Sequence, residues 1–154
     1  MFNIVLYQPE IPGNTGNIIR LCANTGCTLH LIEPLGFQLT DKHLKRAGLD
    51  YNPMVPIHRY ESLEQYLNTH KDSKIYLCTT KGNTNYSNVN FAIGDTFVFG
   101  PETRGLPVEI LVNYSDSQKI RIPMQQPTRS LNLANAVSVV VYEAWRQSSF
   151  QLIL

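Results

Sequence analysis

The chain has 154 residues, a formal net charge of +1 and a charged fraction of only 16%, which suits one domain with a buried core and excludes the strongly basic surface typical of many nucleic-acid-binding domains. Any RNA contact must therefore come from local clusters of charge. No basic leader opens the chain, no run is long enough to cross a membrane, and the three cysteines make an odd number, so we expect a cytoplasmic protein with no membrane partner and with reduced thiols.

The first half of the chain alternates strand-like and helix-like segments. Apolar alternation in residues 2–7 predicts a strand, and the prolines that follow end it before a helix begins. Ser62 and Gln65 have the spacing of a capping box, which predicts the start of another helix. In chain order we expect a strand at 2–7, a helix at 15–24, a strand at 28–33, a helix at 41–47, a strand at 55–58, a helix at 62–68 and a strand at 74–79.

The second half begins with residues 81–90, whose amides and hydroxyls predict a long surface loop. A strand at 96–99, a helix at 108–113, a strand at 119–122 and a helix at 133–145 are expected to follow. The last segment is apolar around most of its circumference, so we expect a partner subunit to cover the side that the sheet leaves open. Periodicity alone also allows a buried strand at 137–142, although the uninterrupted length favours a helix.

This alternation predicts an α/β fold with a mainly parallel sheet, helices on both faces and a single domain over 1–154. Ligands in such sheets bind at the carboxyl ends of the strands. Two loops shaped by Gly and Pro follow predicted strands, one at 100–105 and one at 123–130. Two such loops predict one shared site.

Three short motifs resemble those of the SPOUT methyltransferases, in particular the TrmH-like branch that methylates ribose 2′-hydroxyls in RNA. They are Asn14 with Arg20, then Gly100-Pro101-Glu102-Thr103-Arg104-Gly105, then Ile122-Pro123-Met124 through Ser130-Leu131-Asn132 to Ala136. The resemblance covers essentially the whole chain. It implies a SPOUT-type fold with a C-terminal trefoil knot and a homodimer packed through the first and last helices. It also implies S-adenosyl-L-methionine as methyl donor, S-adenosyl-L-homocysteine as product, and no metal.

Within this branch the chain is most similar to enzymes that methylate the wobble nucleotide of tRNA, either cytidine or a uridine derivative. Segments 7–12, 14–17 and 142–146 carry this closer resemblance. It implies tRNA as the partner, with leucine isoacceptors as expected substrates. The alternatives are 2′-O-methylation of rRNA or of another tRNA position, and a non-catalytic RNA-binding SPOUT protein. The last of these is expected to have lost Arg20, Ser130 or Asn132, and all three are present.

The resemblance also implies roles for individual residues. The cofactor is expected to contact backbone groups at Cys78, Gly100, Ile122, Ser130 and Leu131, with Pro123 adjacent. The expected catalytic residues are Arg20, Ser130, Asn132 and Asn14. A guanidinium with a pKa above about 12 is a poor general base, so we expect Arg20 to bind an RNA phosphate and stabilise the developing alkoxide, while a phosphate oxygen or Ser130 takes the proton.

RNA contacts are expected from Arg129 and Tyr142 across the dimer and from the basic cluster Lys42, Lys45 and Arg46. Several of these residues have plain structural alternatives. Asn14 has the residue type of a helix N-cap, and the same holds for Asn132, while Glu102 orients or caps a neighbouring loop. For Tyr142 a place in the core of a subunit interface is the stronger alternative.

The sequence lacks the residue spacings that a zinc site or a nucleotide-binding loop requires. Cys22, Cys27 and His30 match no common zinc pattern and lack a second pair of ligands. Residues 8–13 lack the Gly-rich fingerprint that a dinucleotide-binding fold places after its first strand, and no phosphate-cradling P-loop is present.

Overall fold

The computed structural model describes residues 1–40, 42, 55–126 and 129–152. One seven-stranded sheet runs through it in the order β3-β2-β1-β6-β4-β7-β5, and every neighbouring pair is parallel. Its strands are β1 (Asn3–Tyr7), β2 (Thr28–Ile32), β3 (Ile57–Tyr60), β4 (Ile75–Cys78), β5 (Thr84–Asn85), β6 (Thr96–Phe99) and β7 (Lys119–Arg121). The helices are α1 (Pro12–Thr25), α3 (Leu63–Thr69), α4 (Val108–Leu111) and α5 (Leu133–Gln147), with short 3-10 turns η1 (Tyr86–Asn88) and η2 (Asp116–Gln118).

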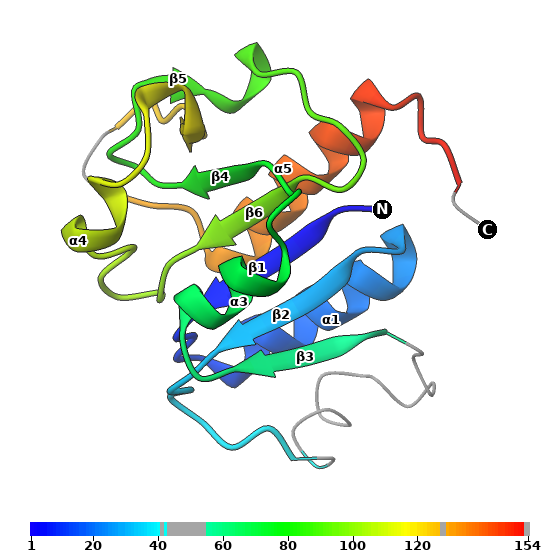
Figure 1. Cartoon of the computed structure of the whole chain (residues 1–154), viewed down its shortest axis with the longest axis vertical. Coiled ribbons are helices and arrows are strands. Elements are labelled where there is room, and N and C mark those ends of the chain that lie inside the picture. The colour runs from blue at the N-terminus through cyan, green and yellow to red at the C-terminus, as the bar shows by residue number, and fades with distance from the viewer. Residues whose placement is uncertain (41, 43–54, 127–128, 153–154) are drawn as a thin grey trace.

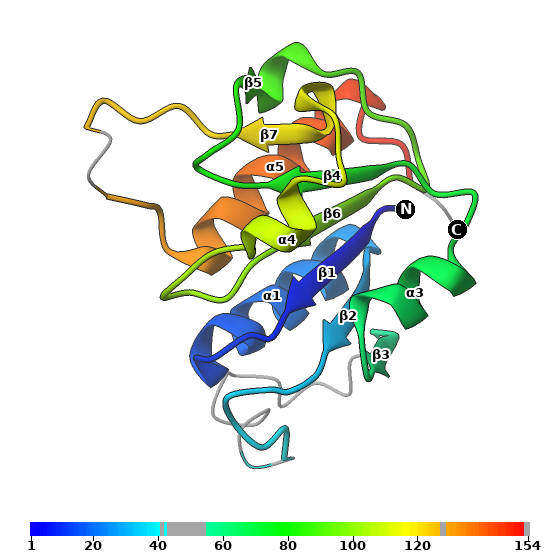
Figure 2. The ribbon, with the colours of Figure 1, turned by 60° about the vertical axis from the view of Figure 1, so that its left-hand side comes forward.

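Helices cover both faces of the sheet, as predicted (Figures 1 and 2). α1 and α5 pack together on one face, where Ile4 and Leu6 of β1 join the larger hydrophobic core. The intervening Val5 joins a second core with residues of α3 and α4 on the opposite face. This alternation follows from the two-residue period of a strand, and burial on both sides explains why the central strands are almost wholly apolar.

Helix α1 begins earlier than predicted, because Pro12 occupies its first turn, where a missing N–H costs nothing. The N-cap is Ile11, which makes no side-chain capping bond. The capping role considered for Asn14 is therefore wrong, and Asn14 lies buried inside the first turn. The predicted end is confirmed, since Gly26 closes the helix in the left-handed conformation with φ 71°.

Of three further predictions, two change and one is confirmed. The strand expected at 55–58 lies two residues later, as β3. The helix expected at 62–68 is confirmed as α3, and Ser62 Oγ caps it by accepting from the Gln65 N–H at 3.1 Å. The reciprocal bond of a capping box is shifted by one residue, because Gln65 Oε1 accepts from the Glu61 N–H at 2.8 Å and not from the Ser62 N–H. The loop expected at 81–90 contains β5 and η1, because main-chain pairing with β7 holds this polar segment at the sheet edge. The helix expected at 41–47 lies outside the described residues, apart from Lys42.

β7 lies between β4 and β5, although both of those strands precede it in the chain. The connection at 79–83 therefore crosses β7 to reach the sheet edge. Gly82 makes this crossing possible, because a Cβ there would clash with the backbone of Lys119 and Ile120. Thr79 also donates its N–H to the Ile120 carbonyl at 2.9 Å. The trefoil knot itself stays a prediction.

The last apolar segment is a helix, as length had favoured. Its buried side consists of Ala134, Val137, Val140, Val141 and Ala144. Tyr142 faces outward and is 45% exposed, with its ring edge against Trp145. Among the described helices none is long and apolar enough to span a membrane.

Candidate functional site

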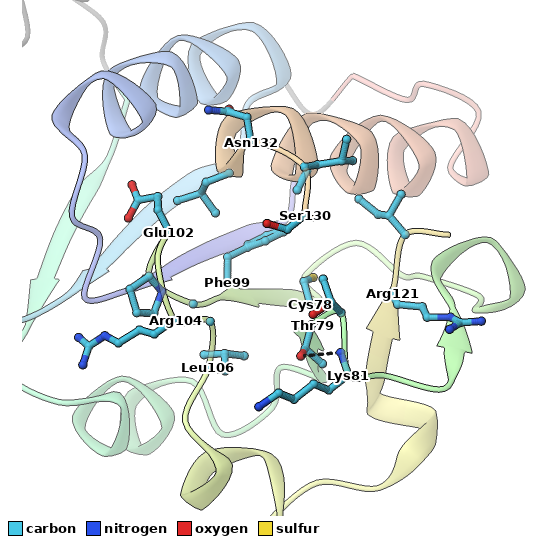
Figure 3. A pocket seen from close by; sticks show the side chains of 18 of the residues that line it. Cys78, Thr79, Lys81, Phe99, Glu102, Arg104, Leu106, Arg121, Ser130 and Asn132 are labelled. Carbon is cyan, nitrogen blue, oxygen red and sulfur yellow. Dashed lines mark hydrogen bonds between the residues drawn. The ribbon is translucent and has the colours of Figure 1, made fainter. Parts of the chain in front are cut away.

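A cavity of about 400 Å³ opens at the carboxyl ends of β4, β6 and β7 (Figure 3). This is the edge where the sequence predicted a shared site. The 100–105 loop forms one wall, and residues 120–124 and 130–133 form another. The 79–81 segment and the inner side of α5 close the remainder. The volume falls in the range of small-molecule sites, which is about 300–1,000 Å³.

The 100–105 loop is a tight turn that depends on glycine at both ends. Gly105 has φ 66°, in the left-handed region that suits a residue without a side chain, and it donates its N–H to the Pro101 carbonyl at 2.9 Å. Gly100 cannot carry a Cβ, because that atom would overlap the backbone of Gly105 and Leu106. The 100–105 loop thus packs against Gly100 too closely for any side chain at that position.

Glu102 places its carboxylate at the start of α1. Its Oε2 accepts from the Glu10 N–H at 2.7 Å and its Oε1 from the Ile11 N–H at 3.0 Å. A carboxylate in this position is stabilised by unpaired backbone donors and by the positive end of the helix dipole. Glu102 therefore supplies from the second motif the cap that Ile11 lacks, which confirms the capping alternative.

Asn14 and Asn132 extend this contact across the cavity mouth. Asn14 Nδ2 donates to Glu102 Oε1 at 3.2 Å, and Asn14 Oδ1 accepts from Asn132 Nδ2 at 2.9 Å. Asn132 Oδ1 in turn accepts from the Asn135 N–H at 3.3 Å and caps α5. A carboxylate only accepts, so Glu102 fixes the orientation of both amides. One directional chain of hydrogen bonds joins all three motifs.

A second set of contacts joins the loop after β1 to the 100–105 loop. Thr103 Oγ1 donates to the Glu10 carboxylate at 2.9 Å, and Arg104 Nη2 donates to Gln8 Oε1 at 2.9 Å. Together with the Glu102 bonds, these contacts fix the 100–105 loop against the end of β1.

The cavity wall combines apolar side chains with open backbone donors. Within the described part of the chain, the N–H groups of Ile122, Ser130 and Leu131 donate no hydrogen bond. Cys78 lies on the wall, and burial raises the pKa of its thiol well above the ordinary value. The thiol therefore stays protonated and is a poor nucleophile. Such a surface suits a cofactor that has an apolar part and several hydrogen-bond acceptors.

Most predicted site residues meet in this cavity, and some do not. The residues that line it are Asn14, Cys78, Gly100, Ile122, Ser130, Leu131 and Asn132. Arg20 is exposed on α1 and does not line it. Arg129, Lys42 and Tyr142 are also exposed and lie outside it, whereas Lys45 and Arg46 fall outside the described residues.

The sequence prediction missed the wall formed by Thr79, Thr80 and Lys81, as well as Leu106. Residues 79–81 directly follow β4, so the strand-end rule that found the other two loops also applied to this one. Leu106 carried no polar signal, because its contribution is a buried apolar contact.

Comparison with known proteins identifies the family. The model of the SpoU rRNA Methylase family matches residues 1–142. The chain belongs to this family. The predicted resemblance to SPOUT methyltransferases of the TrmH-like branch is therefore confirmed, and the SpoU-family fold is the parallel α/β sheet described above.

Relatives of this SpoU-family chain match it over nearly its full length. A tRNA (cytidine(34)-2′-O)-methyltransferase from Aeromonas hydrophila is 57% identical over 150 residues, which are 97% of this chain and 96% of that protein. A solved structure from work on 2-OH methylation of C/U34 on tRNA is 45% identical, covers 98% of both chains and has a TM-score of 0.90. An AdoMet-bound rRNA methyltransferase from Sinorhizobium meliloti is 25% identical with a TM-score of 0.81, and 94% of this chain matches 56% of that one.

Proposed function

We propose that this SpoU-family chain transfers a methyl group from S-adenosyl-L-methionine to the ribose 2′-hydroxyl of the wobble nucleotide of tRNA, in the cytoplasm. The target base is cytidine or a uridine derivative, and leucine isoacceptors are the expected tRNAs. One observation carries the proposal: the three motifs converge on one cavity in a chain that is 57% identical to a tRNA (cytidine(34)-2′-O)-methyltransferase.

The cavity residues fit the cofactor. The open N–H groups of Ile122, Ser130 and Leu131 would hold its polar groups, with Gly100 and Cys78 on the facing wall. When bound, S-adenosyl-L-methionine supplies a methyl group on a positively charged sulfur. The protonated thiol of Cys78 does not compete with the ribose for that methyl group.

Transfer requires the ribose oxygen to approach the methyl carbon in line with the departing sulfur, so positioning is the main task of the protein. Asn132 and Asn14 lie in fixed orientations at the cavity mouth and would hold the ribose. Ser130 Oγ makes no hydrogen bond within the described residues and would accept a hydrogen bond from the 2′-hydroxyl; the proton would end on a phosphate oxygen of the RNA, either directly or through Ser130, which gives up its own proton as it takes that of the ribose.

Arg20 would act from outside the cavity. Its exposed position on α1 suits contact with an RNA phosphate next to the target nucleotide. There its positive charge would stabilise the developing alkoxide. Arg129, Lys42 and Arg46 would add phosphate contacts.

A homodimer would complete the RNA surface. α1 and α5 lie side by side on one face of the sheet (Figure 2), and Tyr142 projects from that layer. A second copy packed on α5 would cover Tyr142 and the half-buried Val139, as the apolar character of this helix suggests.

The decisive experiment incubates the protein with labelled S-adenosyl-L-methionine and total tRNA that lacks its native modifications, and then maps the labelled nucleotide. Label on the ribose of the wobble nucleotide supports the proposal. Label on a base, or in rRNA alone, overturns the target.

An Arg20→Ala variant tests the role of the arginine. We expect unchanged binding of S-adenosyl-L-homocysteine in calorimetry and a loss of transfer of about 100-fold or more. Equal loss of binding and transfer contradicts this role and assigns Arg20 to the structure.

A further inference from the structure

Arg104 lies on the rim of the cavity, exposed to solvent. In Figure 3 its side chain points away from Cys78 and Thr79. We propose that Arg104 binds a phosphate of the RNA backbone beside the target nucleotide, and that Gln8 is a positioning residue that holds the guanidinium without neutralising it. This inference rests on the proposed function and adds a specific RNA contact to it.

Gln8 holds Arg104 from a fixed place at the end of β1. Its side-chain Oε1 accepts from Arg104 Nη2 at 2.9 Å, while its Nε2 donates to the Glu33 carbonyl at 3.4 Å. The Gln8 N–H donates to the Ile32 carbonyl at 3.0 Å. Its φ is 49°, which is uncommon for a residue with a side chain and recurs at functional sites.

The Gln8 amide leaves the charge of Arg104 intact. A guanidinium has five donors and a permanent positive charge, and among the described residues this one donates a single side-chain hydrogen bond, to a neutral partner. Across the described ranges, the ion pairs do not include Arg104. Each carboxylate on the adjoining segments is engaged by other donors: Glu10 by Thr103, Glu102 by the Glu10 and Ile11 backbone, and Glu33 by Arg59. The rim thus carries a pre-positioned cation that forms no ion pair within the described part of the chain.

An arginine without an ion-pair partner suits a phosphate, because its planar guanidinium can donate two parallel hydrogen bonds to two phosphate oxygens. Two anions would approach this cavity, namely the RNA backbone and the carboxylate of the cofactor. Arg104 is exposed and points away from Cys78 and Thr79 in the cavity wall, which favours the RNA, because the RNA must approach from solvent. The loop beneath it is held by the Glu102 and Thr103 bonds, so little ordering is needed on binding.

The test uses two variants of the protein. One neutralises the charge of Arg104 with a carboxylate beside it, and the other removes the guanidinium. Gln8→Glu keeps the side-chain length and turns the partner of Arg104 into a carboxylate, whereas Arg104→Gln removes the guanidinium. We expect each to weaken tRNA binding about tenfold in filter assays and to lower the salt-dependence slope by about one. We expect the affinity for S-adenosyl-L-homocysteine in calorimetry to stay unchanged.

A double variant separates charge from structure. Gln8→Met removes the acceptor without adding a charge; if Gln8 acts through Arg104, this change weakens tRNA binding in the wild type but causes no further loss in the Arg104→Gln protein. A matched control is Lys71→Gln, which removes the same charge before β4, at the end of the sheet opposite the cavity.

Three results overturn the inference. They are tRNA affinities of the variants equal to that of the control, loss of S-adenosyl-L-homocysteine binding instead of tRNA binding, and additive losses in the double variant. Failure of the wild-type protein to methylate any ribose refutes the proposed function instead, and it is seen before any variant is compared.

Discussion

Asn132 donates its side-chain N–H to Asn14 Oδ1 at 2.9 Å across a sequence separation of 118 residues. The same side chain caps α5 through its oxygen. One amide thus stabilises a helix and sets the orientation of a second amide at the cavity mouth. These two tasks can be separated by mutation.

Asn132→Asp keeps an oxygen for the Asn135 N–H but loses the N–H that Asn14 accepts. We expect an unchanged melting temperature and a fall in kcat of about tenfold or more, because misplacement at the site is costly. Initial rates at saturating tRNA and cofactor, with circular dichroism for stability, measure both. Asn135→Asp is the control, since it adds the same charge to the same helix turn; an equal fall in that protein contradicts the role of the Asn132–Asn14 bond.

Glu102→Gln tests the cap supplied to α1 from the 100–105 loop. An amide NH₂ cannot accept from the backbone N–H groups of Glu10 and Ile11, so one donor is left unsatisfied. We expect the free energy of unfolding in urea to fall by about 1–3 kcal/mol. Glu109→Gln makes the same change on the exposed side of α4, and its stability should equal that of the wild type. Similar losses in both proteins would mean that the effect is not specific to the cap.

His30 predicts a dependence of stability on pH. It is 1% exposed, its ring nitrogens lie 3.2 Å from Tyr60 Oη and from Asn3 Oδ1, and burial lowers its pKa to about 3. In the unfolded chain the His30 ring takes up a proton near pH 6.5, whereas in the folded protein it stays neutral until about pH 3. The free energy of unfolding therefore falls as the pH falls from 6.5 toward 3.

For this single group the expected loss between pH 7.5 and pH 5 is about 2 kcal/mol. Urea unfolding of the wild type and of His30→Gln at both pH values measures it. The variant should be less stable at pH 7.5 but should lose about 2 kcal/mol less on acidification. Parallel losses in the two proteins would assign the acid sensitivity to other groups.

Tyr142→Glu tests the proposed dimer. A charge on the outward side of α5 should be costly to bury against a second copy, so sedimentation should shift from dimer to monomer. Val112→Glu places the same charge at a 71% exposed position next to α4, on the opposite face of the sheet, and should leave the dimer intact. A monomeric wild type, or a dimer that tolerates both substitutions, refutes this interface.

The sequence predicted the elements whose signals are local. Strand-like segments placed β1, β4, β6 and β7, and Ser62 marked the start of α3 because capping depends on neighbouring residues. It failed where a distant group decides the outcome. α1 starts at Pro12 with a cap from Glu102, 91 positions beyond the Ile11 N–H that it accepts. β5 is a strand only because β7 lies beside it.

The site, too, was predictable where its signals are local and not where they depend on distant contacts. The glycine and proline loops after two strands pointed to the cavity, because strand ends meet at one edge of a parallel sheet. The contacts between motifs were not visible, since the pairing of Asn14 with Asn132 depends on how α1 and α5 pack. Arg20 follows Asn14 by six residues on α1. In a helix of 3.6 residues per turn, this spacing puts the two side chains on different faces, so Arg20 lies outside the cavity that Asn14 lines.

Because β7 lies between β4 and β5, this edge of the sheet can form only late in synthesis at the ribosome. β5 has its only described strand partner in β7, and that partner emerges about 35 residues later. A nascent chain that has reached α4 already contains the crossing loop with Gly82, but nothing yet lies beneath it. The sheet edge and the cavity wall at residues 120–124 are therefore completed in the same late step, so incomplete chains should bind no cofactor.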